Sequence, residues 1–140
     1  MTTDILWFSE LGLKDLDRVG GKNASLGEMV SNLAELGVRV PDGFATTSAA
    51  FRRFIGDTGL AERISGELKG LDTDDTQRLA EVGKAIREEV ANQPFPEDLE
   101  ADVRSAYERL VDGREDVSFA VRSSATAEDL PDASFAGQQE

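Results

Sequence analysis

The fold is built around Val19-Gly20-Gly21-Lys22-Asn23-Ala24-Ser25-Leu26-Gly27-Glu28-Met29, a two-glycine turn that leads into an amphipathic helix. The start of a helix leaves several backbone N–H groups without intrahelical partners and carries partial positive charge. A lysine beside these groups makes an anion site, and phosphate is the obvious ligand. The alternative is an ordinary helix entry whose Lys22 side chain points into water.

Apolar residues recur at helical spacing after this turn and predict one buried stripe. Its members are Leu26, Met29, Val30, Leu33 and Leu36. Gly37 is suited to the left-handed conformation that ends many helices, so we expect the helix to stop there.

The rest of the sequence predicts an α+β chain that is rich in helices and has a few short strands. Strand-like patterns occupy 5–8, 38–40, 44–47 and 117–121, and Phe135 begins another strand-like run. Helical spacing predicts a short helix capped by Ser48, a second helix from Leu60 to Leu71, and two longer ones. The longer helices follow the cap cluster at 72–75 and Pro96.

Length and composition indicate one domain that covers residues 1–140. Fifteen basic against 28 acidic residues give a net charge of −13, which argues against a nucleic-acid or anionic-membrane partner. No signal peptide or membrane span is predicted, and the absence of cysteine agrees with a reducing cytoplasm. The chain also has no histidine, so it carries neither the usual general base near pH 7 nor a phosphohistidine.

Much of the negative charge lies between residues 56 and 115, a stretch that contains 16 acidic and 8 basic residues. Helices with this balance usually present a solvated outer face, which is the interpretation we favour. A docking surface for a partner is the alternative.

A second candidate for phosphate binding lies near the other end of the chain. Val117, Phe119 and Val121 alternate with polar or small residues, so Arg122 leaves the predicted strand on its polar side. An arginine grips two phosphate oxygens through its planar fork and a lysine acts as a point charge, so Arg122 and Lys22 together suit a polyphosphate. Taken singly, each is more typical of a surface or salt-bridge residue.

The loop after Arg122 carries the hydroxyl groups of Ser123, Ser124 and Thr126. These hydroxyls are candidate donors to phosphate oxygens, although loop hydroxyls more often satisfy their own backbone. The acids Glu128 and Asp129 follow, but neighbouring loop acids are usually solvated and we assign no metal ligand in this chain.

The lysine turn differs from a Walker A loop, which requires Gly-x-x-x-x-Gly-Lys-Ser/Thr. Leu16 stands where that motif has its first glycine, and Asn23 stands where it has the hydroxyl residue.

Two blocks of sequence carry a family resemblance. The first runs from Asp17 to Thr47 and contains the two-glycine turn and Val40-Pro41-Asp42-Gly43-Phe44. The second runs from Phe119 to Glu140 and contains Ala120-Val121-Arg122-Ser123-Ser124-Ala125-Thr126-Ala127-Glu128-Asp129-Leu130-Pro131. Both blocks resemble the phosphoenolpyruvate synthase family, also called pyruvate, water dikinase. The acidic helices between them carry little family information.

The resemblance implies the first, N-terminal subdomain of an ATP-grasp domain, with ATP held between it and a second subdomain. Lys22 and Arg122 match ATP-phosphate ligands of the family, and Gly137 matches a backbone position next to the nucleotide. The family transfers the β-phosphoryl group of ATP to a histidine, releases AMP and phosphate, and then phosphorylates pyruvate, with magnesium as the required ion. The histidine, the pyruvate domain and the magnesium ligands are expected outside this chain.

The sequence stops in a strand-like run, so we expect a truncated piece of a longer protein that is inactive alone. Rifampicin phosphotransferase is similar in its Arg-Ser-Ser-Ala-Thr-Ala-Glu-Asp block and remains the alternative enzyme, whereas pyruvate, phosphate dikinase differs in its arginine block. A non-catalytic acidic helical binding module is the alternative outside the enzymes.

Overall fold

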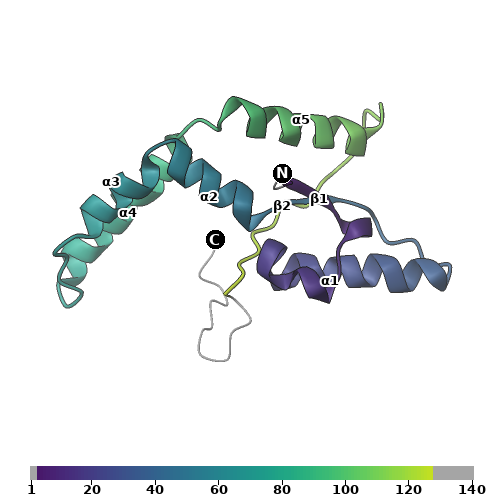
Figure 1. Cartoon of the computed structure of the whole chain (residues 1–140), viewed down its shortest axis with the longest axis horizontal. Coiled ribbons are helices and arrows are strands. Elements are labelled where there is room, and N and C mark those ends of the chain that lie inside the picture. The colour runs from purple at the N-terminus through teal and green to yellow at the C-terminus, as the bar shows by residue number, and fades with distance from the viewer. Residues whose placement is uncertain (1–2, 128–140) are drawn as a thin grey trace.

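A computed structural model of the chain describes residues 3–127 and shows a small antiparallel sheet with helices on either side of it and a pair of helices that extends away from it (Figure 1). The predicted α+β, helix-rich class is confirmed. In chain order the elements are β1 (Ile5–Trp7), η1 (Phe8–Glu10), η2 (Leu13–Asp15), α1 (Leu16–Glu35), β2 (Phe44–Thr46), α2 (Ser48–Asp57), α3 (Leu60–Leu68), α4 (Thr76–Asn92) and α5 (Glu97–Val111). No helix in this part of the chain has the length and apolar character that a membrane crossing requires.

The sheet joins the first strand to the second in antiparallel register, with Ile5 opposite Thr46 and Trp7 opposite Phe44. Cross-strand aromatic contact supports this pairing, since the rings of Trp7 and Phe44 lie 5.7 Å apart. The guanidinium of Arg109 on α5 lies 4.2 Å from the centre of the Trp7 ring, so a cation–π contact ties α5 to β1.

The strands predicted at 38–40 and 117–121 do not form in the described residues. Alternation fixes the faces that side chains would take, but a strand also needs a hydrogen-bonded neighbour. Residues 117–125 instead run past the sheet without regular structure (Figure 1). The ring of Phe119 packs 5.4 Å from that of Tyr107, while Val121 is 97% exposed.

The buried face predicted for α1 is wrong. Met29 is 48% exposed and Leu36 is 76% exposed. Small residues take the inner face instead, and the buried set is Val19, Gly20, Gly21, Ala24 and Gly27. The physical reason is close backbone approach, because a Cβ at Gly27 would lie 2.4 Å from the Cβ of Leu11. Leu11 and Ala24 belong to one core cluster that also includes Val19 and Ala45.

The predicted end of α1 at Gly37 is confirmed. Gly37 has a φ of 74°, and its N–H donates to the carbonyl of Ala34 at 3.0 Å. The N–H of Val38 donates to the carbonyl of Leu33 at 2.9 Å, which completes a Schellman motif.

The other helices form close to their predicted positions, although the helix predicted from Leu60 to Leu71 ends at Leu68. Helices α2, α3 and α5 bury a second core cluster made of Ala50, Phe54, Leu60 and Leu99. Asp75 caps α4 by accepting from the N–H of Arg78 at 3.0 Å. The cap of α2 is Thr47, which accepts from the N–H of Ala50 at 3.2 Å, and the predicted cap Ser48 is wrong by one residue. Thr47 still has extended backbone, whereas Ser48 is already helical and donates to the carbonyl of Asp17 at 3.1 Å.

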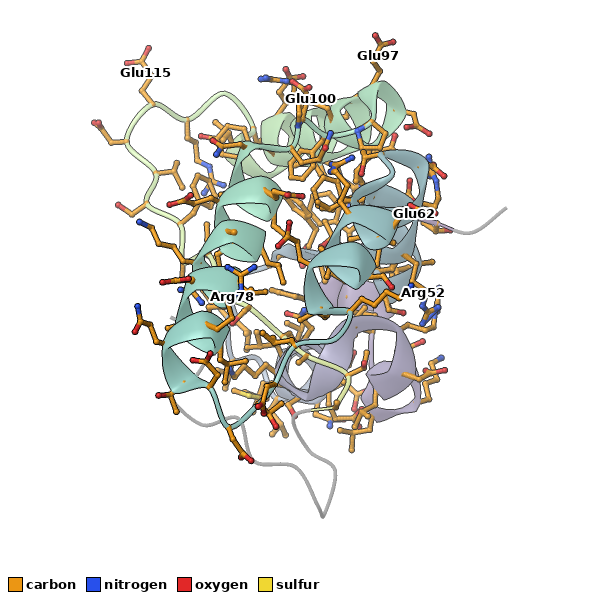
Figure 2. All side chains as sticks on the ribbon, turned by 90° about the vertical axis from the view of Figure 1, so that its left-hand side faces the viewer. Arg52, Glu62, Arg78, Glu97, Glu100 and Glu115 are labelled. Atoms are coloured by element: carbon orange, nitrogen blue, oxygen red, sulfur yellow. The ribbon has the colours of Figure 1, made fainter. Side chains whose placement is uncertain are left out.

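Acidic side chains on the helical half of the molecule, which we define as residues 56–115, are largely exposed. In Figure 2 Glu97 and Glu115 project outward. Several acids pair with a nearby base, for example Glu100 with Arg104 at 2.7 Å and Glu89 with Arg63 at 3.2 Å. Exposed pairs of this kind contribute little to stability, so they favour the interpretation of a solvated face.

One arginine on α2 joins this helix to the segment before β1 and to the start of α5. Arg53 on α2 hydrogen-bonds Asp4 before β1 and Asp98 at the start of α5, and it lies 3.7 Å from Asp57. The hydrogen bond from Arg53 lowers the pKa of Asp98, and the N–H of Leu99 lowers this pKa further. The hydrogen bond to Asp98 and the negative charge of Asp4 raise the pKa of Arg53.

The glycine face of α1 predicts opposite outcomes for two glycine-to-alanine changes. Gly27→Ala gains helix propensity but forces a methyl group into Leu11, so we expect a net loss of about 1–3 kcal/mol. Gly66→Ala on α3 meets nothing within 4 Å and should stabilise by about 1 kcal/mol. Urea unfolding followed by the fluorescence of Trp7 measures both. Equal stabilisation by the two changes would show that α1 does not need its close contact.

The lowered pKa of Asp98 predicts a pH-dependent loss of stability. A carboxyl group with a lower pKa in the folded state stabilises above its unfolded pKa, about 3.9, and loses this contribution as the pH falls through the folded pKa. Asp98→Asn should therefore lower the melting temperature at pH 7, and its difference from the parent should shrink between about pH 4 and pH 2. Asp102→Asn, which makes the same charge change one turn later on α5, is the control. A difference that stays constant down to pH 2 would contradict the assignment.

Candidate phosphate-binding site

The candidate site begins at a break inside α1. Gly20 has φ 78° and ψ 164°, which interrupts the helix and makes it restart at Gly21. Glycine is the residue that adopts this conformation without strain. The predicted order of turn and helix is therefore present, but α1 already begins at Leu16, so one helical turn precedes the break. After the break, Gly21, Lys22 and Asn23 form the first turn of the restarted helix.

The segment after α5 reaches this break from the other end of the sequence. The N–H of Asn23 donates to the Oγ of Ser124 at 3.4 Å, across 101 residues of chain. A Cβ at Gly20 would lie 2.4 Å from the same Oγ and 2.9 Å from the carbonyl oxygen of Ala125. In Figure 1 the yellow-green end of the described chain meets the N-terminal end of α1. The two stretches predicted to bind phosphate therefore lie side by side.

The predicted site residues take the following places. Lys22 is the second residue of the restarted helix and is exposed. Arg122 and Ser123 are exposed just before Ser124, which is half-buried against Gly20. Thr126 is exposed two residues later, and Gly137 lies outside the described residues. The structure thus brings the backbone next to Lys22 into contact with the loop that follows Arg122.

Asn23 is a residue of this site that the sequence argument missed. Its side-chain Nδ2 donates to the carbonyl of Val19 at 3.0 Å, so Asn23 bonds across the break as well as to Ser124. Its position in the sequence could have identified it, because Asn23 is the third residue of a helix that starts after a glycine. The N–H at this position is the one that a helix cap satisfies.

One acid near the break, Asp15, is paired within the fold. Asp15 is buried just before α1, accepts from the N–H of Gly12 at 3.2 Å and pairs with Arg18 at 2.9 Å. The positive charge of Arg18 offsets that of the Asp15 carboxylate, which weakens the repulsion between Asp15 and an anion bound at the break.

No metal cluster competes for this assignment within residues 3–127. No group of three or more acidic, histidine or cysteine side chains there could hold a metal ion, and Glu128 and Asp129 lie outside the range. A shallow hollow near η1 and η2 is lined in part by Glu10 and Glu28, and its lining includes neither Lys22 nor Arg122. These acids make the hollow unsuitable for phosphate.

Comparison with known proteins points to nucleotide binding. Residues 16–140 match the family described as the pyruvate phosphate dikinase, AMP/ATP-binding domain. The chain is 59% identical over 138 residues to phosphoenolpyruvate synthase of Neisseria meningitidis and 55% identical over 136 residues to that of Escherichia coli. It is 53% identical over 140 residues to phosphoenolpyruvate synthase of Pseudomonas aeruginosa.

The matched regions cover almost all of this chain and a small part of each relative. They include 97% of the chain and 17% of the Neisseria and Escherichia proteins, and 100% of the chain and 18% of the Pseudomonas protein. The chain therefore spans less than a fifth of the length of these curated relatives.

Proposed function

The chain belongs to the pyruvate phosphate dikinase AMP/ATP-binding domain family, and from this premise we propose that it holds the phosphates of ATP within a longer phosphoenolpyruvate synthase. The observation that carries the proposal is the contact between Asn23 and Ser124, because it joins the lysine turn to the arginine loop. Residues 1–140 form the first subdomain of an ATP-grasp domain in this proposal, and the second subdomain closes the nucleotide site.

Lys22 and Arg122 carry the electrostatic work of the proposed site. The lysine supplies a point charge beside the N–H groups of a helix start, and the arginine supplies two parallel donors. Because the chain carries a net charge of −13, these local groups must attract ATP against the field of the whole domain. Ser123, Ser124 and Thr126 line the same loop as further donors, and Gly137 is proposed as a backbone contact to the nucleotide.

The whole protein is proposed to convert ATP, pyruvate and water into phosphoenolpyruvate, AMP and phosphate in the cytoplasm. The β-phosphoryl group moves first to a histidine, which this chain does not contain, and then to pyruvate in another domain. This chain's part is to hold the polyphosphate in line and to neutralise its charge, which is the work that dominates catalysis of phosphoryl transfer. Magnesium would be held by residues outside this chain.

Removing either charge should weaken ATP binding in the full-length protein. Charge-assisted hydrogen bonds contribute about 1.5–3 kcal/mol each, so Lys22→Ala and Arg122→Ala should each raise the Kd for ATP by about ten- to a hundredfold. Arg122→Lys should recover part of the loss, because it restores the charge without the planar fork.

Isothermal titration calorimetry measures these affinities, and Lys69→Ala and Arg104→Ala provide controls on exposed bases of the helical half. Unchanged ATP affinity in both site variants would remove the basis for the phosphate assignment.

The phosphoryl acceptor separates the two enzymes that share the arginine block. Full-length protein incubated with ATP should form AMP in proportion to added pyruvate, with phosphoenolpyruvate appearing in equal amount. A rifamycin in place of pyruvate should leave AMP formation at its background rate. AMP formation that ignores pyruvate and follows the rifamycin would exclude the synthase assignment.

A further inference from the structure

We infer that Ser124 is a positioning residue, which caps the Lys22 helix from a distant part of the chain and thereby sets Lys22 and Arg122 in register. The expected effect of Ser124 on ATP binding rests on the proposed function. The capping contact between Ser124 and Asn23 does not depend on that function.

The restarted helix has no cap from its own sequence. Gly20 stands at the cap position, and glycine has no side chain that could accept a hydrogen bond. At an ordinary helix start, the hydroxyl of a serine at the cap position accepts from the N–H of the second or third helical residue. This helix therefore needs an acceptor from elsewhere in the molecule.

Ser124 supplies that acceptor. Its Oγ accepts from the N–H of Asn23, the third residue after Gly20, at 3.4 Å. This N–H is one that a local serine cap would satisfy. Ser124 thus takes the role of the cap residue although it lies 101 positions from Asn23 in the sequence.

The fit between the two segments requires the absence of a side chain at Gly20. A Cβ there would lie 2.4 Å from the Oγ of Ser124 and 2.9 Å from the carbonyl oxygen of Ala125. These distances are shorter than van der Waals contact, so any residue with a Cβ at position 20 would clash with the loop and push it away. Gly20 therefore has two tasks, which are to break the helix and to admit the cap.

The consequence for the phosphate site follows from sequence proximity. Lys22 is the neighbour of Asn23, and Arg122 lies two residues before Ser124. One hydrogen bond thus fixes the spacing of two cations that would otherwise belong to independent segments. Preorganisation of this kind strengthens binding because the ordering cost is paid during folding.

A direct role in phosphate binding is the competing interpretation of Ser124. A hydroxyl group has one donor and two acceptor lone pairs, so the bond from Asn23 leaves the O–H able to donate. The two roles differ in how Ser124 depends on Lys22. A positioning residue acts through the lysine, whereas a direct ligand acts beside it.

The test uses the full-length protein and the variants Ser124→Ala and Ser124→Thr. Without nucleotide, Ser124→Ala should speed amide hydrogen exchange at Asn23, and Ser124→Thr should restore protection because it keeps the hydroxyl. Loss of a helix cap costs about 1 kcal/mol, so Ser124→Ala should raise the Kd for ATP measurably and by up to about fivefold, the limit reached when ATP binding must restore the lost order. Ser65→Ala, on an exposed position of α3, is the matched control.

A double-mutant cycle with Lys22→Ala distinguishes the two roles. If Ser124 acts by positioning, its effect on ATP affinity should fall below about twofold once Lys22 is removed. An undiminished effect in the Lys22→Ala background, or unchanged exchange at Asn23 in Ser124→Ala, would overturn the inference. Unchanged ATP affinity in both Lys22→Ala and Arg122→Ala would refute the proposed function, and the exchange data would then report on the cap alone.

Gly20→Ala provides a second variant that acts on the same contact from the other side. It should weaken ATP binding more than Gly37→Ala does. Both glycines have positive φ, but a Cβ at Gly37 meets nothing within 4 Å. Equal ATP affinity in the two variants would contradict the need for close approach at Gly20.

Discussion

The backbone conformation of Gly20 is the constraint on which the rest of the candidate site depends. With φ at 78°, it stops one helical turn and starts the next helix two residues before Asn23. In the first turn of the restarted helix the N–H of Asn23 donates to the Oγ of Ser124, and the missing Cβ at Gly20 lets this loop approach. Lys22 is the sequence neighbour of Asn23 and Arg122 lies two residues before Ser124, and we propose that these two cations bind one polyphosphate.

The same use of glycine determines how α1 is held in the fold. Gly21, Ala24 and Gly27 give α1 a narrow inner face that packs close to the backbone at Leu11. The larger apolar side chains on its other faces remain wholly or partly accessible. Rigid support for the restarted helix therefore comes from backbone proximity more than from burial of large side chains, and that support is sensitive to single methyl groups.

Local patterns predicted most of the elements and failed where contacts are distant in sequence. Helices α2 to α5 and strands β1 and β2 follow from apolar spacing, caps and turn residues, all of which act within a few positions. The buried face of α1 could not be predicted, because hydrophobic periodicity does not reveal a close approach to Leu11. The predicted strand at 117–121 also failed, because alternation does not supply a partner strand. Lys22 and Arg122 were identified by residue type, but the contact through Asn23 and Ser124 required the structure.

A crystal structure of the full-length protein with a non-hydrolysable ATP analogue tests the shared phosphate site most directly. In that complex we expect the Nζ of Lys22 and the guanidinium of Arg122 both to lie within about 3 Å of phosphate oxygens. We also expect the Oγ of Ser124 to accept from the N–H of Asn23, as it does without nucleotide. Phosphates bound away from both cations, or a loop separated from Gly20 in the complex, would show that these two segments do not form one phosphate site.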